Sequence, residues 1–92
     1  MEKEYLSIGT VVELHEKEGY LFMITGLLAE NSNGERRDYI AVRYPTGMLN
    51  RDNLYFFNHE QIERIVHYGY INGEHEIYTA LLKAALKTDE KE

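Results

Sequence analysis

Histidine and acidic side chains are the groups of this 92-residue chain best suited to catalysis or metal binding. The histidines stand at positions 15, 59, 67 and 75, and this spacing matches no compact metal-binding motif. The chain has no cysteine, which excludes a thiolate nucleophile and a cysteine-bound metal. We therefore expect no metal site, no resident cofactor and no catalytic residue.

The adjacent pair His59-Glu60 has the residue types of an acid-base couple. Asn58 before the pair is a favourable N-cap residue, and Gln61 completes a capping-box pattern. Because neighbouring side chains diverge around a helix axis, we interpret the pair as part of a helix start. A small enzyme or ligand-binding barrel that uses His59, Glu60 and nearby tyrosines is the alternative, and it requires these side chains to meet in one pocket.

Eight tyrosines supply most of the aromatic side chains. Tyr55 is out of phase with its apolar neighbours, and Tyr68 and Tyr70 fall on one side of an extended segment. Exposed amphipathic rings of this kind are enriched at protein interfaces. The alternative interpretation is that the rings cover the ends of a small barrel and keep their hydroxyl groups in water.

The formal net charge is −6, from 16 acidic and 10 basic residues spread along the chain. A protein that neutralises phosphates usually has a net basic face, so this charge argues against a nucleic-acid partner. The N-terminal residues lack the pattern of a signal peptide, and no apolar run has the length of a membrane helix. We expect one cytoplasmic domain, residues 1–92, that binds neither nucleic acid nor membranes.

The first part of the chain predicts two strands. Residues 10–15 alternate between apolar and polar types, which is typical of a half-buried strand with Val12 and Leu14 facing inward. Residues 20–30 are apolar on both sides, as in a central strand. Gly26 within them is expected to mark a bend or a bulge.

A hairpin and a third strand follow. The dipeptide Asn33-Gly34 predicts a tight turn, because both residues tolerate positive φ angles. Residues 37–44 then form the next strand, for which the pattern predicts one buried and one exposed face. The residues expected to face inward are Ile40, Val42 and Tyr44, and those expected to face outward are Tyr39 and Arg43.

The fold class follows from the order of these elements. Residues 54–57 predict a short strand, and residues 64–70 return to strand after the helical turn because β-branched and aromatic types dominate there. Four strands, a single helical turn and a fifth strand give the order of a small SH3-like barrel with a strongly bent second strand. The predicted fold is mainly β with α+β character, either this five-stranded barrel or a bent antiparallel sheet, with a core over residues 5–71 and a C-terminal helix.

Residues 72–87 predict that C-terminal helix, with Asn72 as its cap and apolar residues at helical spacing. The apolar stripe can dock on the protein's own sheet or bind another chain, including a second copy in a homodimer. The tails, residues 1–4 and 88–92, are expected to fray. The residues predicted to bind a partner are Tyr55, Tyr68, Tyr70, Ile77, Tyr78, Leu81, Leu82 and Leu86.

Four segments of the chain also resemble a known family: "YLSIGTVVEL", "YLFMITGLL", "DYIAVRYPTG" and "LYFFNHEQIERIVHYGY". The family consists of short single-domain proteins of unknown function from Gram-positive bacteria, often encoded beside LXG-type toxins and the type VII secretion apparatus. The resemblance runs from about Tyr5 to Tyr70. Ser7 stands where the family pattern has proline, and Ala41 stands where it has glycine.

The resemblance implies a cellular setting and says little about mechanism, because its motifs are mostly turn, cap and core residues. Family members look like accessory factors, either targeting factors or chaperones, that act on the helical secretion domain of a toxin together with small helical proteins. We therefore expect a non-enzymatic protein-binding module with helical protein partners. A nucleic-acid-binding SH3-like barrel is the weaker alternative, which the acidic charge disfavours.

Overall fold

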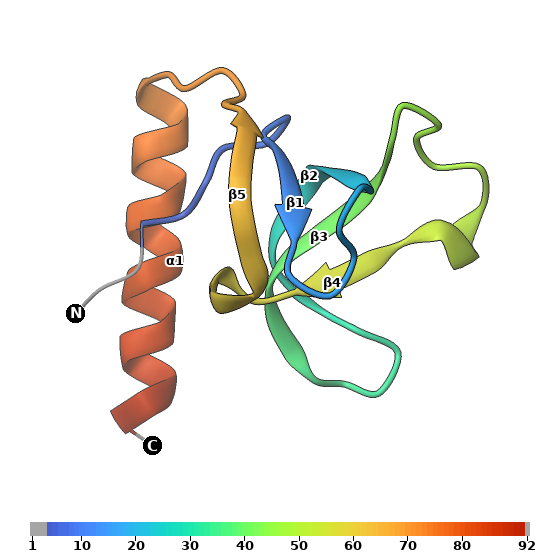
Figure 1. Cartoon of the computed structure of the whole chain (residues 1–92). Coiled ribbons are helices and arrows are strands. Elements are labelled where there is room, and N and C mark those ends of the chain that lie inside the picture. Colours follow the sequence, from blue (N-terminus) through green and yellow to red (C-terminus); the bar gives the residue numbers. More distant parts are fainter. Residues whose placement is uncertain (1–3, 92) are drawn as a thin grey trace.

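Five strands, two short 3-10 turns and one long helix make up the protein (Figure 1). The computed structural model describes residues 4–91, with side chains through residue 86. In chain order the elements are β1 (Val11–Leu14), β2 (Leu21–Glu30), β3 (Arg36–Tyr44), η1 (Arg51–Asn53), β4 (Tyr55–Phe57), η2 (His59–Gln61), β5 (Ile62–His67) and α1 (Gly73–Lys91).

The strands form one antiparallel sheet in the order β4-β3-β2-β1-β5. This is the order expected for an SH3-like barrel, but the sheet does not close, because β4 and β5 remain its two edges. The closed barrel was therefore the wrong one of the two predicted alternatives. A mainly β fold with α+β character, built as a bent antiparallel sheet with a C-terminal helix, is confirmed.

The second strand bends where the sequence predicts it. Its first part pairs with β1 and its whole length pairs with β3, and the register shifts between Ile24 and Gly26. A Cβ atom at Gly26 would collide with the side chain of Ile40 on β3. Glycine at this position therefore allows the two strands to approach closely at the bulge.

The core lies inside the bent sheet, and Leu82 and Leu86 of α1 pack against it. Its buried aromatic and aliphatic side chains come from every strand except β5 and from the segment before β1; they are Tyr5, Val12, Leu14, Phe22, Ile24, Leu27, Tyr39, Ala41 and Phe57. Val12 and Leu14 face inward as predicted, with Glu13 and His15 on the other side. The hairpin at Asn33-Gly34 also forms as predicted, with Gly34 at a φ of 77°.

The prediction for β3 is right at Val42, which is buried, and wrong at both tyrosines. Tyr39 is buried, with 1% of its surface exposed, whereas Tyr44 is exposed. Buried tyrosine is stable here because its hydroxyl group has partners: it accepts from the Leu6 N–H and lies 3.0 Å from His59 Nδ1. Both faces of β3 carry apolar residues, so hydropathy distinguished them poorly. The prediction followed the face with isoleucine and valine.

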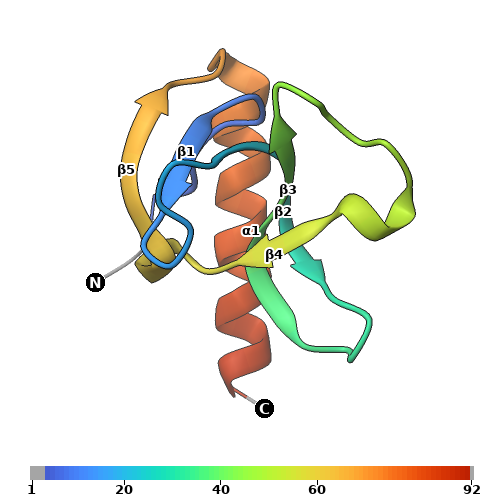
Figure 2. The same ribbon diagram turned by 45° about the vertical axis from the view of Figure 1, so that its right-hand side comes forward.

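The terminal helix begins at Gly73, after the predicted cap. The Asn72 Oδ1 accepts from the His75 N–H at 2.9 Å, which satisfies one of the free donors of the first turn. The helix stands beside the sheet in Figure 1 and behind it in Figure 2, so it covers one side of the sheet. It continues to Lys91, beyond the predicted end at residue 87. Of the tails predicted to fray, residues 1–4 and 88–92, residues 1–3 and 92 lie outside the described residues.

The last strand ends earlier than predicted. The sequence predicts a strand over residues 64–70, but β5 covers Ile62–His67, and residues 68–72 connect it to the helix. Tyr68 and Tyr70 are therefore held by this connection and not by a strand.

Candidate functional site

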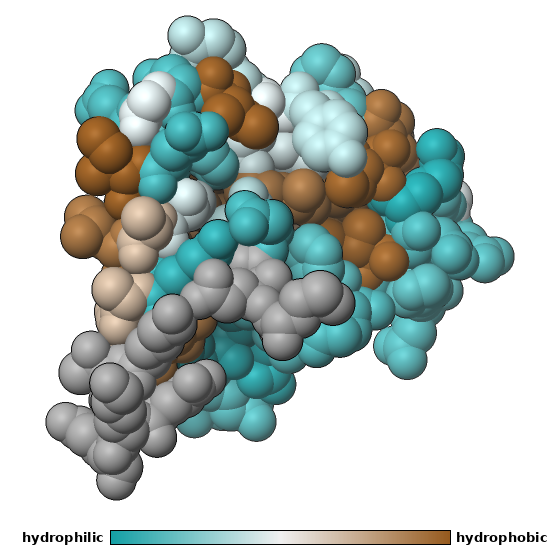
Figure 3. Space-filling model, turned by 90° about the vertical axis from the view of Figure 1, so that its left-hand side faces the viewer, coloured by the Kyte–Doolittle hydropathy of each residue, from teal (hydrophilic) through white to brown (hydrophobic). Residues whose placement is uncertain are grey.

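Large apolar side chains are exposed along the connection after β5 and on the first half of α1. Tyr68 and Tyr70 expose 61% and 83% of their surface, and Leu81 exposes 62%. Figure 3 faces the helix and shows apolar side chains on its upper part. We call this set the tyrosine-helix surface; it consists of Tyr68, Tyr70, Ile71, Ile77, Tyr78 and Leu81.

The helix has two apolar faces, where the sequence analysis treated its apolar residues as one stripe. The inner face carries Thr79, which is buried, and Leu82 and Leu86, which pack against the core. The outer face carries Ile77, Tyr78 and Leu81, all exposed. Docking on the protein's own sheet therefore occupies one side of α1 and leaves the other uncovered.

A polar clip fixes the main chain between the two exposed tyrosines; it consists of the buried Ser7 and Thr10 and the half-buried Gly69. The Gly69 N–H donates to Thr10 Oγ1 at 3.0 Å, and Ser7 Oγ donates to the Gly69 carbonyl at 2.9 Å. The two hydroxyl oxygens lie 3.0 Å apart, so one donates to the other and closes a ring of hydrogen bonds. Since Gly69 lies between Tyr68 and Tyr70, the clip fixes the main chain that presents both rings.

Glycine is required in the clip because the backbone segments touch. A Cβ atom at residue 69 would collide with the carbonyl oxygen of Ile8 and come within 2.8 Å of main-chain atoms of Gly9 and Thr10. Backbone atoms cannot move aside as a flexible side chain can. The Gly-Tyr pair of the sequence is therefore explained by close packing between the N-terminal segment and the connection to the helix.

A groove of about 580 Å³ runs between α1 and the segment before β1. Tyr68 and Ile71 form part of its wall, so the tyrosine-helix surface continues into it. Its charged residues have both signs, Glu4 and Glu76 against Lys83, and His59 and His75 also line it. Lys83 Nζ lies 3.2 Å from Glu4 Oε1 and connects the two walls.

The His59-Glu60 pair does not form a common site. His59 lines the groove beside α1, whereas Glu60 lines a separate hollow of about 230 Å³ with His15 and Glu16. The His59 N–H donates to Asp38 Oδ2 at 2.8 Å, and Asn58 Oδ1 accepts from the Asp38 N–H. The Gln61 side chain closes the predicted capping box by accepting from the Asn58 N–H at 2.8 Å. These bonds give Asn58, His59 and Gln61 a structural role at this corner of the chain.

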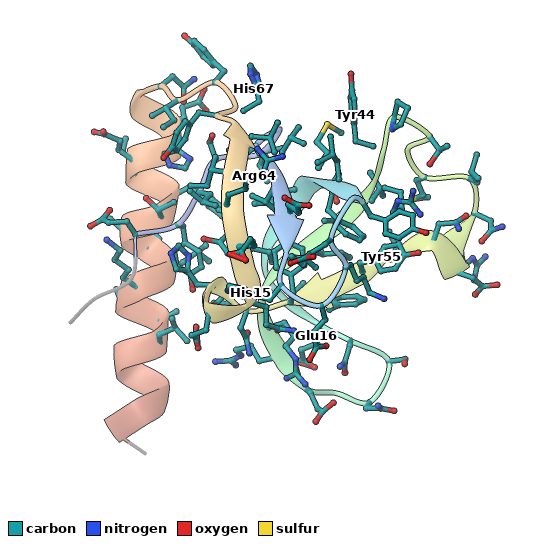
Figure 4. The ribbon with its side chains drawn as sticks, viewed as in Figure 1. His15, Glu16, Tyr44, Tyr55, Arg64 and His67 are labelled. Atoms are coloured by element: carbon teal, nitrogen blue, oxygen red, sulfur yellow. The ribbon has the colours of Figure 1, made fainter. Side chains whose placement is uncertain are left out.

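Three of the predicted binding residues lie away from the tyrosine-helix surface. Tyr55 is half-buried on β4, with its ring 5.0 Å from that of Phe22, and Figure 4 places it on the side of the sheet remote from α1. Leu82 and Leu86 face the core. The other five predicted residues belong to the surface.

The sequence analysis missed a second exposed apolar region at the end of the sheet. Tyr44 and His67 point outward there (Figure 4) and line a hollow of about 500 Å³ whose floor includes Val11 and Met23. Tyr20, Met48 and Leu49 are also exposed. Apolar residues in the segment between β3 and β4 were the signal that could have indicated this region.

The clearest electrostatic feature lies between β1 and β5. The Gly19 N–H donates to Glu13 Oε2 at 2.7 Å, and Arg64 Nε donates to Glu13 Oε1 at 2.7 Å. The hydrogen bond from Gly19, followed by that from Arg64, holds the pKa of Glu13 below its ordinary value of 4.5. The interaction stabilises the sheet edge and lies outside the tyrosine-helix surface.

Among the side chains described, those of residues 4–86, no three His, Asp or Glu groups come together in a way that could hold a metal ion. No helix in the described part of the chain combines the length and hydrophobicity needed to cross a membrane.

Comparison with known proteins relates the chain to one family. No curated protein and no solved structure matches it. One family model matches residues 5–77, which include all five strands, the clip and the start of α1. The chain therefore belongs to the family described as "Domain of unknown function (DUF4176)".

Proposed function

We propose that this protein is a non-enzymatic protein-binding module that receives a helical segment of its partner on the tyrosine-helix surface. The observation that carries the proposal is the uncovered outer face of α1. Ile77 and Leu81 lie one helical turn apart and remain exposed although the opposite side of the helix is docked. An apolar stripe of this kind is complementary to the apolar face of another helix.

The clip strengthens the proposal because it fixes the backbone on both sides of Gly69. Rigid aromatic side chains lose little conformational entropy on binding and often contribute most of the binding energy at an interface. We assign this character to Tyr68 and Tyr70, since the main chain between them is tied to Ser7 and Thr10 by partly buried hydrogen bonds. The two rings and the helix face therefore offer a preorganised apolar surface.

The proposed biological role is that of a cytoplasmic accessory factor, a chaperone or targeting factor, for an LXG toxin of the type VII secretion system. Its support is the motif resemblance described above, together with the fit between an exposed helix face and a helical toxin domain. Small helical proteins are the proposed additional partners. The role is a proposal from family resemblance and surface chemistry.

Affinity purification of the tagged protein from its native host at endogenous level, followed by mass spectrometry, tests the proposal. We expect stoichiometric recovery of an LXG-domain protein and loss of that protein with Leu81→Asp. Leu49→Asp is the matched control, since Leu49 is an equally exposed leucine in the loop after β3. Circular dichroism of both variants checks that the fold is retained.

Two outcomes would contradict the proposal: no stoichiometric protein partner for the wild type, or a partner that is retained by folded Leu81→Asp. Sedimentation of the purified protein tests whether a second copy of the chain occupies the outer face of α1 in place of a partner. A dimer that dissociates on Leu81→Asp would assign the outer face of α1 to self-association in place of a toxin domain.

A further inference from the structure

The tripeptide Asn-Gly-Glu occurs twice in the chain, at residues 33–35 and 72–74. Asparagine is chemically labile, and glycine after it leaves room for attack by the main chain. The glycine nitrogen bonds to the asparagine Cγ, ammonia leaves, and a five-membered succinimide forms; water then opens the ring to aspartate or isoaspartate. We propose that Asn72 is a site of this spontaneous deamidation and that the fold directs the reaction to Asn72 in preference to Asn33.

The hairpin opposes the reaction at Asn33 because its nucleophile is already engaged. The Gly34 N–H donates to the Asn31 carbonyl at 3.0 Å. Asn31 Oδ1 also accepts from the N–H groups of Asn33 and Glu35, each at 3.0 Å. Ring closure at Asn33 would require the Gly34 nitrogen to lose its proton and its acceptor together, and would distort a turn held by these bonds.

The start of α1 favours the reaction at Asn72. Gly73 is the first helical residue, and its N–H has no acceptor among residues 4–91. The Asn72 Oδ1 accepts from the His75 N–H at 2.9 Å, and this oxygen gains negative charge when the glycine nitrogen attacks Cγ. The positive end of the helix dipole stabilises negative charge on both the attacking nitrogen and this oxygen.

The position of Asn72 gives the reaction a structural consequence. Asn72 joins the connection held by the clip to the first turn of α1, directly after the exposed Ile71. Aspartate would add a negative charge at the helix start and keep a cap oxygen. Isoaspartate would add a methylene group to the main chain and move the cap away from the His75 N–H. Deamidation is thus expected to produce two forms that differ in how the helix begins.

The test is an incubation of the purified full chain at mildly alkaline pH and physiological temperature. Samples taken over time are digested briefly with trypsin, which places the two asparagines on different peptides, and chromatography with mass spectrometry separates asparagine, aspartate and isoaspartate. We expect conversion at Asn72 to be severalfold faster than at Asn33 in the folded protein. In concentrated denaturant the two rates should converge, because the reacting tripeptides are identical.

Gly73→Ala is the matched control. A Cβ atom at Gly73 would meet nothing within 4 Å, so this variant should fold normally. It should slow conversion at Asn72 and leave Asn33 unchanged. Conversion at Asn33 that equals or exceeds that at Asn72 in the folded chain, or conversion at Asn72 unaffected by Gly73→Ala, would overturn the proposal. Because the measurement is a mass change in the free protein, its result is independent of whether a protein partner is found.

Discussion

The clip and the tyrosine-helix surface reverse the usual distribution of polar and apolar groups. The clip buries two hydroxyl groups, those of Ser7 and Thr10, while the neighbouring surface exposes large apolar side chains. The two regions are joined through Gly69, which is bonded to both hydroxyl groups and lies between two exposed tyrosines. An exposed apolar surface can therefore depend on buried hydroxyl groups for its position.

The buried hydroxyl groups and the exposed apolar side chains contribute differently to stability. Burial of a hydroxyl group is unfavourable unless it is hydrogen-bonded, and in the clip each hydroxyl has partners within 3.0 Å. Exposed tyrosine and leucine side chains contribute little to folding, because they gain nothing from burial in the free protein. Substitutions in the clip should therefore change stability, whereas substitutions on the surface should change binding.

The largest effect is expected for Gly69→Ala. The added methyl group would meet main-chain atoms of residues 8–10, so the clip must open, and we expect the free energy of unfolding to fall by about 3 kcal/mol. Denaturant unfolding followed by circular dichroism measures this change. Gly73→Ala, four residues later in open space, should be neutral or stabilise by up to about 1 kcal/mol. Equal effects of the two substitutions would show that close packing at Gly69 is unimportant.

The next largest effect is expected for Thr10→Val, which keeps the side-chain shape but removes the hydroxyl group. The Gly69 N–H would lose its acceptor and Ser7 would lose a neighbour, at a cost of about 2 kcal/mol. Thr10→Ser, which retains the hydroxyl group, should restore most of this loss. Urea unfolding of the three proteins provides the comparison, and a Thr10→Val variant as stable as the wild type would refute the role of the hydrogen-bonded ring.

The two faces of α1 supply the third prediction. Leu82→Ala should lower the free energy of unfolding by about 1.5 kcal/mol, because Leu82 packs against the core but remains partly exposed. Leu81→Ala should change it by less than about 0.5 kcal/mol, because that side chain is largely in solvent. Thermal unfolding of both variants measures the difference. Similar losses for the two leucines would mean that the outer face is also covered.

The sequence predicted those parts of the fold that depend on short-range patterns. The strand containing Val12, the bulge at Gly26, the hairpin at Asn33-Gly34 and the cap at Asn72 are all confirmed. Each depends on alternation or on the backbone preference of one or two residues. Tyr39 was wrongly predicted to face outward, because its burial depends on partners from Leu6 and His59, which lie 33 and 20 residues away in the chain.

The candidate site was predicted less well than the fold. Hydropathy placed Leu81 and Leu82 in one stripe, but their directions differ by about 100° around a helix, so only Leu82 reaches the core. The clip was not predicted, because Ser7 and Thr10 meet Gly69 only after the sheet has formed. Its ring of hydrogen bonds spans a sequence separation of 62 residues between Ser7 and Gly69.

The smallest effect on stability is expected for Glu13, whose hydrogen bonds are exposed to solvent, unlike those of the clip. Glu13 accepts from Gly19 and Arg64 at the sheet edge, and its lowered pKa means that the folded protein favours the ionised form more than the unfolded chain does. Its stabilising contribution is therefore complete above a pH of about 4.5 and is lost as the pH falls through the lower pKa of the folded state.

Glu13→Gln should accordingly reduce the acid dependence of the melting temperature and lower the melting temperature slightly at neutral pH. Melting curves of the two proteins from neutral to acidic pH measure both changes. Parallel curves at all pH values would show that Glu13 does not contribute to acid sensitivity. A fall in melting temperature at neutral pH as large as that caused by Thr10→Val would contradict this ranking, because water competes for the partners of Glu13 but is excluded from Thr10.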